Sequence, residues 1–245
     1  MLDDSGSRTF LSLIIPAYNE QGRIAGTLET VSEFLASYGK PFEVIVVDDG
    51  SSDDTREIAQ ALANADPSIR VIGHGPNRGK GYAVRQGVCV SRGSFVAFSD
   101  ADLSTPIGQL GKLFAATDKG YDIAIGSRAV AGSELVVRQP LCRELGGKAL
   151  NLVIRALAVP GIKDTQCGFK LFRGDVAREM FAKCFVDSWG FDVEVLYVAR
   201  RFNYTIAEIP VVWQHAPGST VRPFRAGLEV VKDIVRIRLH NYARR

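Results

Sequence analysis

Apolar and polar positions alternate in blocks along the first half of the chain. Short apolar runs bounded by turn residues predict buried strands, and longer stretches with apolar residues three or four positions apart predict amphipathic helices. The predicted strands are Phe10–Pro16, Phe42–Val47, Ile69–Ile72, Ser94–Ser99 and Tyr121–Ile125. The predicted helices are Glu20–Tyr38, Asp53–Ala63, Tyr82–Val90 and Ile107–Thr117. This alternation predicts an α/β fold with a mostly parallel central sheet and helices on both faces.

The second half of the chain is less regular. Its predicted elements are a largely helical stretch Ser133–Val159, a strand Cys167–Phe172, helices Asp175–Ala182 and Phe191–Phe202, and an extended run Thr205–Trp213. The stretch Phe224–Tyr242 predicts an amphipathic helix. We expect its apolar residues to share one side: Leu228, Val231, Ile234, Val235 and Ile237. With no repeat or linker in sight, we expect one domain with halves at about residues 10–127 and 128–245.

Composition limits the classes of function. The net charge of +3 is too small to indicate nucleic-acid binding, but it is compatible with an anionic substrate or a membrane surface. The four cysteines form no C-x-x-C pair, so neither a zinc site nor a disulfide framework is indicated. No signal peptide and no apolar run of about 20 residues is found. We therefore expect a cytoplasmic protein that contacts a membrane, if at all, peripherally on its cytoplasmic face.

Polar and acidic residues follow three of the predicted strands. They are the segment Pro16–Glu20 (PAYNE), the segment Asp48–Ser51 (DDGS), and the pair Asp100 and Asp102. Because parallel strands end at the same edge of a sheet, these residues should line one crevice. Residues two apart in an extended chain point to the same side, so Asp100 and Asp102 can converge on Mg²⁺ or Mn²⁺. The alternative is a surface turn that caps the following helix.

The segment Gly79-Lys80-Gly81 predicts a flexible loop with a cation beside a helix start, which suits a phosphate group. The alternative is an ordinary turn with a solvated lysine. Neither the G-x-G-x-x-G fingerprint of dinucleotide-binding folds nor the P-loop pattern is present where it would be needed. Both of those nucleotide-binding classes are therefore excluded.

In this order and spacing, the motifs PAYNE, VVDDGSSDDT, NRGKG and SDADLSTP resemble the nucleotide-sugar half of glycosyltransferase family 2, which has the GT-A fold. The downstream segments GSR (Gly126–Arg128), DTQCGFKLF (Asp164–Phe172) and WGFDVEVLYVARR (Trp189–Arg201), with the late Trp213 and Gly218-Ser219, resemble dolichyl-phosphate β-glucosyltransferases. The resemblance runs from about Phe10 to Leu239. Polyprenyl-phosphate mannose synthases share the first half but usually differ at DTQCGFKLF.

The resemblance implies transfer of glucose from UDP-glucose to a polyprenyl phosphate, with inversion and with Mg²⁺ or Mn²⁺ as cofactor. It implies that Asp102 is the direct metal ligand and that Asp100 lies near the metal or the ribose. It places Lys80 near the phosphates and Pro16 in the turn. The residues expected to hold the nucleotide are Tyr18, Glu20, Asp48 and Asp49.

On the acceptor side, a phosphate monoester is already mostly ionised near pH 7, so it needs orientation rather than a general base. The cations Arg128 and Arg222 are expected to orient it. By resemblance, Asp164, Asp192 and Gln166 are expected to contact the acceptor or the sugar. The alternatives are helix capping for Asp164 and a buried ion pair for Asp192.

The C-terminal helix has two interpretations. Its apolar face either enters a membrane interface while its basic end meets anionic headgroups, or it packs on the sheet. Two departures bear on this choice: eukaryotic members begin with a membrane anchor that this chain lacks, and Thr220 replaces the family's usual basic residue. Two other functions stay open: a family 2 enzyme with another donor, such as GDP-mannose, or a soluble acceptor, and a non-catalytic nucleotide-sugar-binding protein.

Overall fold

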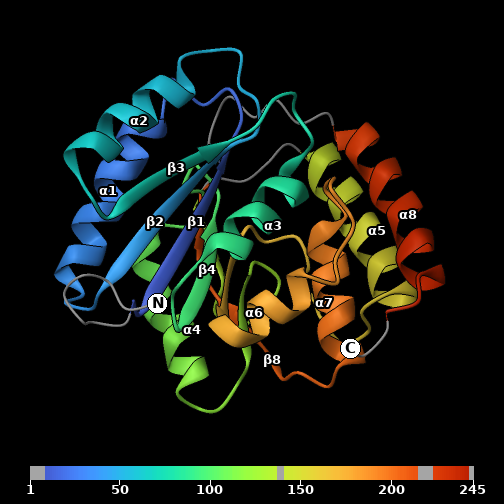
Figure 1. Ribbon diagram of the computed structural model, residues 1–245. Helices are drawn as coiled ribbons and strands as arrows, with labels where there is room; N and C mark the ends of the chain where they lie inside the picture. Colours follow the sequence, from blue (N-terminus) through green and yellow to red (C-terminus); the bar gives the residue numbers. More distant parts are fainter. Residues whose placement is uncertain (1–8, 137–140, 215–222, 243–245) are drawn as a thin grey trace.

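The computed structural model describes residues 9–136, 141–214 and 223–242. Its centre is a seven-stranded sheet with the order β3-β2-β1-β4-β7-β5-β8 (Figure 1). The strands are β1 (Leu11–Ala17), β2 (Phe42–Asp48), β3 (Ile69–Gly73), β4 (Phe95–Ser99), β5 (Ile123–Ser127), β7 (Phe169–Arg173) and β8 (Ile206–Pro210). Strand β7 is antiparallel to both of its neighbours, whereas the other pairs are parallel. The sheet is therefore mostly parallel, as the sequence predicts.

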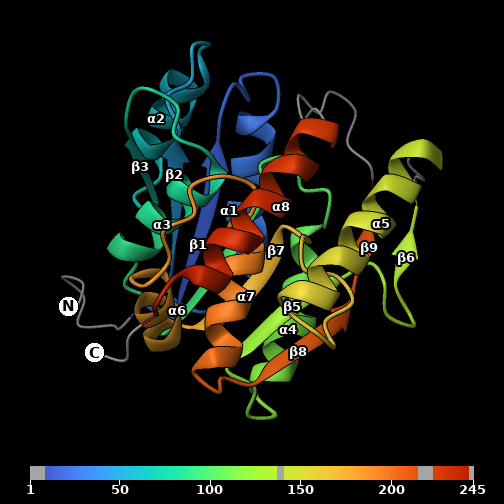
Figure 2. The same ribbon diagram turned by 90° about the vertical axis from the view of Figure 1, so that its right-hand side faces the viewer.

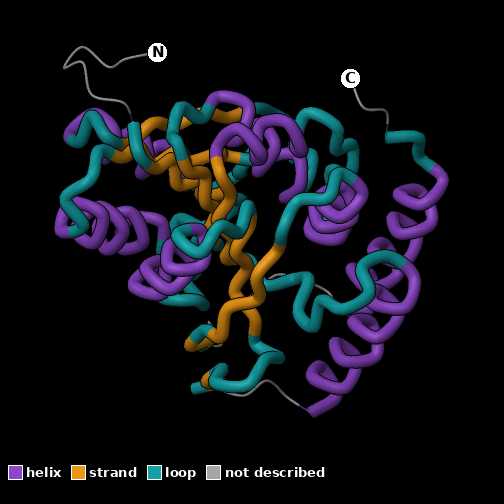
Figure 3. The backbone as a smooth tube through the Cα atoms, turned by 90° about the horizontal axis from the view of Figure 1, so that it is seen from below, coloured by secondary structure: helices purple, strands orange, loops and turns teal. Residues whose placement is uncertain are grey.

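Helices cover both faces of this sheet, and Figure 3 shows the strands passing between them. The helices are α1 (Ile24–Ser37), α2 (Thr55–Ala65), α3 (Lys80–Val90), α4 (Leu110–Thr117), α5 (Leu141–Leu157), α6 (Gly174–Phe181), α7 (Phe191–Arg201) and α8 (Pro223–Leu239), with a short 3₁₀ helix at Ile107–Gln109 before α4. Buried residues of α1, α2 and α4 pack on one face of the sheet. Those of α3, α5, α6, α7 and α8 pack on the other.

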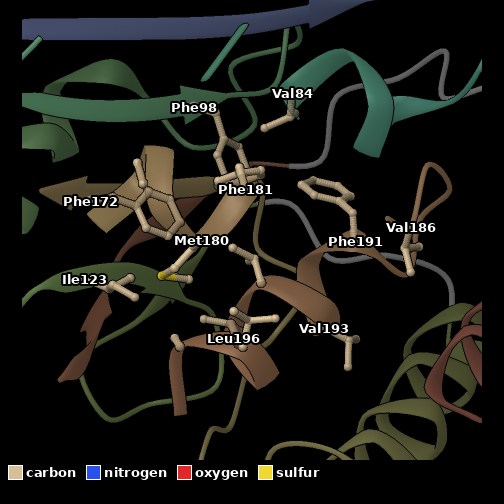
Figure 4. Packing of buried hydrophobic residues seen from close by; sticks show 14 of the residues in the cluster. Val84, Phe98, Ile123, Phe172, Met180, Phe181, Val186, Phe191, Val193 and Leu196 are labelled. Atoms are coloured by element: carbon tan, nitrogen blue, oxygen red, sulfur yellow. The ribbon is translucent and has the colours of Figure 1, made fainter. Parts of the chain in front are cut away.

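The apolar strand runs build these two layers because successive side chains of a strand point to opposite faces. In β1, Leu13 and Ile15 join the first layer, and Ile14 joins the second. Figure 4 shows the second layer, where Phe98 of β4, Phe172 of β7 and other large side chains meet the helices. Strands buried on both faces need continuous apolar runs, which is the pattern that the sequence shows.

The start of the predicted helix at Ser133 and the start of α3 differ from the structure. The stretch predicted as helical from Ser133 begins instead with a short strand, β6 (Glu134–Leu135), which pairs with β9 (Val212–Trp213). It is held there because the Val136 amide donates to the Trp213 carbonyl at 3.0 Å. Helix α3 begins at Lys80 rather than Tyr82, which places the lysine in the first turn of a helix.

The prediction that helix α8 has a single apolar side is wrong. Val230, Ile234 and Ile237 are buried in the core, whereas Leu228 and Val235 are about half exposed, at 50% and 53%. Residues spaced three and four apart trace a narrow stripe along a helix, and α8 buries only that stripe, beside α5 and α7. Within the described residues, no helix combines the length and apolar character needed to cross a membrane.

Candidate active site

The loops that follow β1 and β2 are joined by hydrogen bonds at the carboxyl edge of the sheet. The Ser52 amide donates to Asn19 Oδ1 at 2.8 Å, and the Glu20 amide donates to Thr55 Oγ1 at 2.7 Å. Tyr18 lies in the first of these loops with 43% of its surface exposed. The predicted crevice residues of the first two strands are thus brought together, with an aromatic ring open to a ligand.

Pro16 lies inside β1, opposite Val47 of β2, as the predicted strand Phe10–Pro16 has it, and not in the turn that the resemblance implies. The ladder between β1 and β4 ends at Ile14 and Phe98. The missing amide hydrogen of Pro16 therefore removes no hydrogen bond to β4.

Asp49 is buried and holds the loop that precedes α3. Its carboxylate accepts hydrogen bonds from Asn77 Nδ2 at 2.8 Å and from the amides of Arg78 and Gly79 at 2.9 and 2.8 Å. The neighbouring Asp48 accepts a bond from the Ser51 amide at 3.2 Å. In this arrangement Asp49 fixes where α3 begins and therefore where Lys80 lies.

The two glycines around Lys80 are explained by packing. A Cβ atom at Gly79 would lie 2.5 Å from the Asp187 carbonyl, and one at Gly81 would lie 2.5 Å from the Val186 carbonyl. The segment before α7 therefore rests directly on the start of α3. A flexible loop was predicted here, but Lys80 begins helix α3, whose start packs against the second half of the chain.

Three carboxylates of the first half gather at the edge of the sheet. Burial raises the pKa of Glu20, and the carboxylates of Asp102 and Asp100 raise it further against the opposing effect of Arg23. Asp102 accepts a hydrogen bond from the Ser104 amide at 2.9 Å. Within the described ranges, no three His, Cys, Asp or Glu side chains converge closely enough to hold a metal by themselves.

Lys80 forms an ion pair with Asp100. Burial acts to lower the pKa of Lys80, but the carboxylates of Asp100 and Asp192 outweigh it and leave that pKa above its ordinary value. The ammonium also lies 5.3 Å from the centre of the Trp189 ring. Lys80, predicted to lie near the donor's phosphates, thus lies beside one of the two carboxylates predicted to bind the metal.

Asp192, in the first turn of α7, is paired with Lys170 of β7, and both side chains are almost fully buried. Lys170 also donates to the Cys167 carbonyl at 2.6 Å. Burial raises the pKa of Asp192, although Lys170 and Lys80 act to lower it. The structure thus has the buried ion pair that the sequence analysis kept as the alternative for Asp192.

Arg128 and Asp164, predicted separately, bind each other. Arg128 Nε donates to Asp164 Oδ2 at 2.7 Å, Nη2 donates to Oδ1 at 2.8 Å, and the Arg128 amide donates to Oδ2 at 2.9 Å. Burial opposes the ionised form of Asp164, yet the arginine holds the pKa of Asp164 below its usual value. The Arg128 guanidinium lies 5.6 Å from the centre of the Trp213 ring.

Two predicted residues remain to be placed. Gln166 is half buried in the segment between Asp164 and β7. Arg222 lies outside the described residues.

Three residues at this site were not assigned a role from the sequence: Gly168, Lys170 and Trp189. The buried Lys170 had a readable signal, because a lysine between phenylalanines in an apolar strand requires a charged partner.

Comparisons of the sequence with known proteins place this chain among them by similarity. A model of the family "Glycosyl transferase family 2" matches residues 12–181. Dolichyl-phosphate β-glucosyltransferases of Dictyostelium discoideum and Homo sapiens are each 38% identical, and each alignment covers 94% of this chain and about three quarters of the relative.

Solved structures share the fold. Glucosyl-3-phosphoglycerate synthase from Mycobacterium tuberculosis, solved with Mn²⁺, UDP-glucose and phosphoglyceric acid, aligns with a TM-score of 0.70 at 20% identity, covering 96% of this chain and 81% of that one. Mannosyl-3-phosphoglycerate synthase from Rubrobacter xylanophilus aligns with a TM-score of 0.73 at 18% identity, covering 96% of this chain and 77% of that one.

Proposed function

Because this chain belongs to glycosyltransferase family 2 and has the GT-A fold, we propose that it transfers glucose from UDP-glucose to a polyprenyl phosphate with inversion. The observation that carries the proposal is the 38% identity to dolichyl-phosphate β-glucosyltransferases over 94% of the chain. That match extends through the acceptor-side segment Asp164–Phe172 and is not confined to the nucleotide half. The carboxylates at the end of β4 supply the acidic pair that such a transfer uses.

The residues present suit a divalent cation bound jointly with the donor. Asp100 and Asp102 offer hard oxygen ligands, and the Lys80 ammonium on Asp100 shows that a positive charge is stable there. Because no three acidic, His or Cys side chains of the described residues converge closely enough to hold a metal, the donor's phosphates would complete the ligand set. When bound, the cation would supply charge neutralisation for the departing UDP. Lys80 lies where it can bind the same diphosphate.

For the nucleotide, we propose that the exposed Tyr18 ring packs on the uracil and that Glu20 and Asp48 accept hydrogen bonds from the base or ribose. Pro16 lies in the last residues of β1, directly before the loop that carries Tyr18. Asp49 contributes by holding the loop that positions Lys80. This assignment gives Tyr18, Glu20, Asp48 and Asp49 a contact or a positioning role.

For the acceptor, we propose that Arg128 orients the phosphate. Asp164 accepts hydrogen bonds from Nε and Nη2 of the Arg128 guanidinium. The remaining N–H groups of this guanidinium, which has five in all, can face an anion. Asp164 then acts through Arg128. Gln166, two residues after Asp164, is proposed to contact hydroxyl groups of the sugar. No general base is required, because the phosphate nucleophile is already ionised near pH 7.

A radiolabel transfer assay tests the reaction. Purified protein, Mn²⁺ or Mg²⁺ and a polyprenyl phosphate in detergent are mixed with labelled UDP-glucose or, in parallel, with GDP-mannose. We expect label in the organic phase from UDP-glucose alone. Label from GDP-mannose instead would make the chain a mannose synthase, and UDP-glucose hydrolysis without lipid labelling would indicate a soluble acceptor.

The metal assignment is tested with Asp102→Asn. Loss of a ligand that stabilises developing charge is expected to reduce kcat/KM at least about 100-fold, whereas the exposed Asp118→Asn serves as the matched control. Turnover that survives Asp102→Asn unchanged would place the cation elsewhere.

We also propose that the protein docks on an anionic bilayer through α8 and its neighbour α5. The two helices lie side by side (Figure 2), joined where Arg238 donates to the Leu157 carbonyl at 2.6 Å. Their outer surface exposes large apolar side chains: Leu152, Val153 and Leu157 of α5 and Leu228, Val231, Val235 and Leu239 of α8. Exposed Lys232, Arg236 and Arg238 accompany them. Apolar side chains among cations suit the headgroup region of an anionic membrane.

Flotation with vesicles of neutral or anionic lipid tests this docking. Binding is expected only with the anionic lipid, and the double change Val235→Ser and Leu239→Ser should weaken it at least about tenfold. Val90→Ser, an exposed apolar residue at the end of α3, is the control. Equal binding by all variants would disprove the assignment, and a dimer in solution broken by the double change would reassign this face to a second copy of the chain.

A further inference from the structure

The antiparallel strand β7 brings the segment before it to the carboxyl edge of β4. In the register of these strands, Ser99 lies opposite Phe169. The next residue of β4's loop, Asp100, therefore meets the residue before β7, Gly168. If β7 were parallel to β4, its carboxyl end would lie beside Asp100 instead.

The approach between these two residues is closer than a side chain would permit. A Cβ atom at Gly168 would lie 2.1 Å from Oδ2, 2.5 Å from Cγ and 2.6 Å from Oδ1 of Asp100. All three atoms of the carboxylate therefore lie against the Cα atom of Gly168. Any larger residue at this position excludes the observed orientation of Asp100.

Backbone conformation does not account for this glycine. Among the described residues, the glycines with positive φ are Gly39, Gly50, Gly79, Gly120, Gly132 and Gly161, and Gly168 is not one of them. An alanine can adopt its backbone geometry without strain. The space taken by the Asp100 carboxylate is thus the feature of the structure that requires glycine here.

The backbone around Gly168 is anchored on both sides and cannot easily retreat. Phe169 is 1% exposed and Cys167 is also 1% exposed, so both neighbours are buried. Lys170 ties this segment to α7, since its ammonium contacts the Cys167 carbonyl and Asp192. On its other side, the Asp100 carboxylate is held by Lys80.

We propose that Gly168 is a positioning residue for the Asp100 carboxylate: it provides the space that lets Asp100 face the cation and diphosphate of the donor. This inference rests on the proposed function, because it assigns Asp100 to the donor's metal site. The acceptor-side segment Asp164–Phe169 then also belongs to the donor site. Asp164, at its start, binds Arg128, and Gly168, near its end, contacts the Asp100 carboxylate.

The test is the affinity for Mn²⁺ in the presence of UDP, measured by Mn²⁺ electron paramagnetic resonance without any turnover. Gly168→Ala is expected to raise the Mn²⁺ Kd at least about tenfold, as is typical when a residue that orients a metal ligand is changed. Gly111→Ala in α4, where a Cβ atom would meet nothing within 4 Å, is the matched control and should leave the Kd unchanged.

A double-mutant cycle separates this role from general disruption. In the Asp100→Ala background there is no carboxylate to displace, so adding Gly168→Ala should cost no further Mn²⁺ affinity and no further loss of Tm. If Gly168→Ala alone fails to fold, the double variant is expected to recover the folded state. Normal Mn²⁺ binding by Gly168→Ala, or fully additive losses in the cycle, would overturn the proposal.

The same experiment distinguishes this inference from the proposed reaction. If the unaltered protein binds Mn²⁺ with UDP and the cycle behaves as expected, the positioning role stands even where lipid labelling fails. If the unaltered protein binds no Mn²⁺ with UDP, the metal assignment falls and this inference falls with it.

Discussion

Two ion pairs at the edge of the sheet differ in how far water reaches them. In the pair of Lys170 and Asp192, the side chains are 0% and 4% exposed, whereas in the pair of Arg128 and Asp164 they are 30% and 6% exposed. A fully enclosed pair has no room for a ligand and serves to join β7 to α7. A pair that is open on the arginine side can present the remaining N–H groups of that arginine to an anion.

The largest effect is expected from Lys170→Met. The change leaves the Asp192 carboxylate buried without its partner, so the free energy of unfolding should fall by about 3–5 kcal/mol in urea denaturation. The double change Lys170→Met and Asp192→Leu removes both charges and should recover most of that loss. A single variant as stable as the parent would show that water enters this pair, and the contrast between the two pairs would disappear.

A smaller effect on stability, with a specific effect on function, is expected from Arg128→Lys. Lysine keeps the charge but cannot form the two parallel hydrogen bonds to Asp164, which should cost about 1–2 kcal/mol of unfolding free energy. The KM for polyprenyl phosphate should rise while the KM for UDP-glucose changes little. An unchanged acceptor KM would limit Arg128 to a structural role.

The contributions of Asp164 and Asp192 to the free energy of unfolding should also change with pH in opposite directions. The lowered pKa of Asp164 means that its contribution is present above the ordinary value of 3.8 and is lost as the pH falls through the folded value. The raised pKa of Asp192 means that its contribution is full at low pH and is lost as the pH rises from 3.8 through the folded value. Urea denaturation from pH 3 to 7 should therefore show a shallower acid loss for Asp164→Asn than for the parent. An identical slope would contradict the sign for Asp164.

The smallest effect is expected at the exposed pair of Arg173 and Asp175, 3.4 Å apart with side chains 53% and 69% exposed. Arg173→Ala should change the unfolding free energy by no more than about 0.5 kcal/mol, because water screens the pair. It provides the baseline against which the two buried pairs are judged, and a loss comparable with that of Lys170→Met would remove that baseline.

Much of the first half was predictable because its strands and helices are local patterns. The apolar runs that became β1, β2 and β4 are buried on both faces, and the acids that follow them could only lie at the carboxyl edge. The meeting of Glu20 with Asp100 and Asp102 follows from that single rule.

The second half was less predictable, because which of its residues meet depends on the order and register of its strands in the sheet. Nothing local indicates that β7 inserts between β4 and β5 in the opposite direction, and only that insertion places Gly168 against Asp100. Arg128 and Asp164 were both chosen from the sequence, but 36 positions separate them and their pairing required the fold. Which apolar residues of α8 are buried likewise depends on how the helix packs beside α5 and α7.

The position of β7 has a consequence for how the chain is made. Strand β5 is synthesised before β7, yet its sheet neighbours are β7 and β8. On the ribosome, the first four strands of the order β3-β2-β1-β4 can assemble as soon as residue 99 has emerged, while β5 waits without a partner until Phe169–Arg173 follows. During that interval β4 presents an open edge, which is the kind of surface that recruits other chains. A nascent chain released before residue 169 is therefore expected to aggregate.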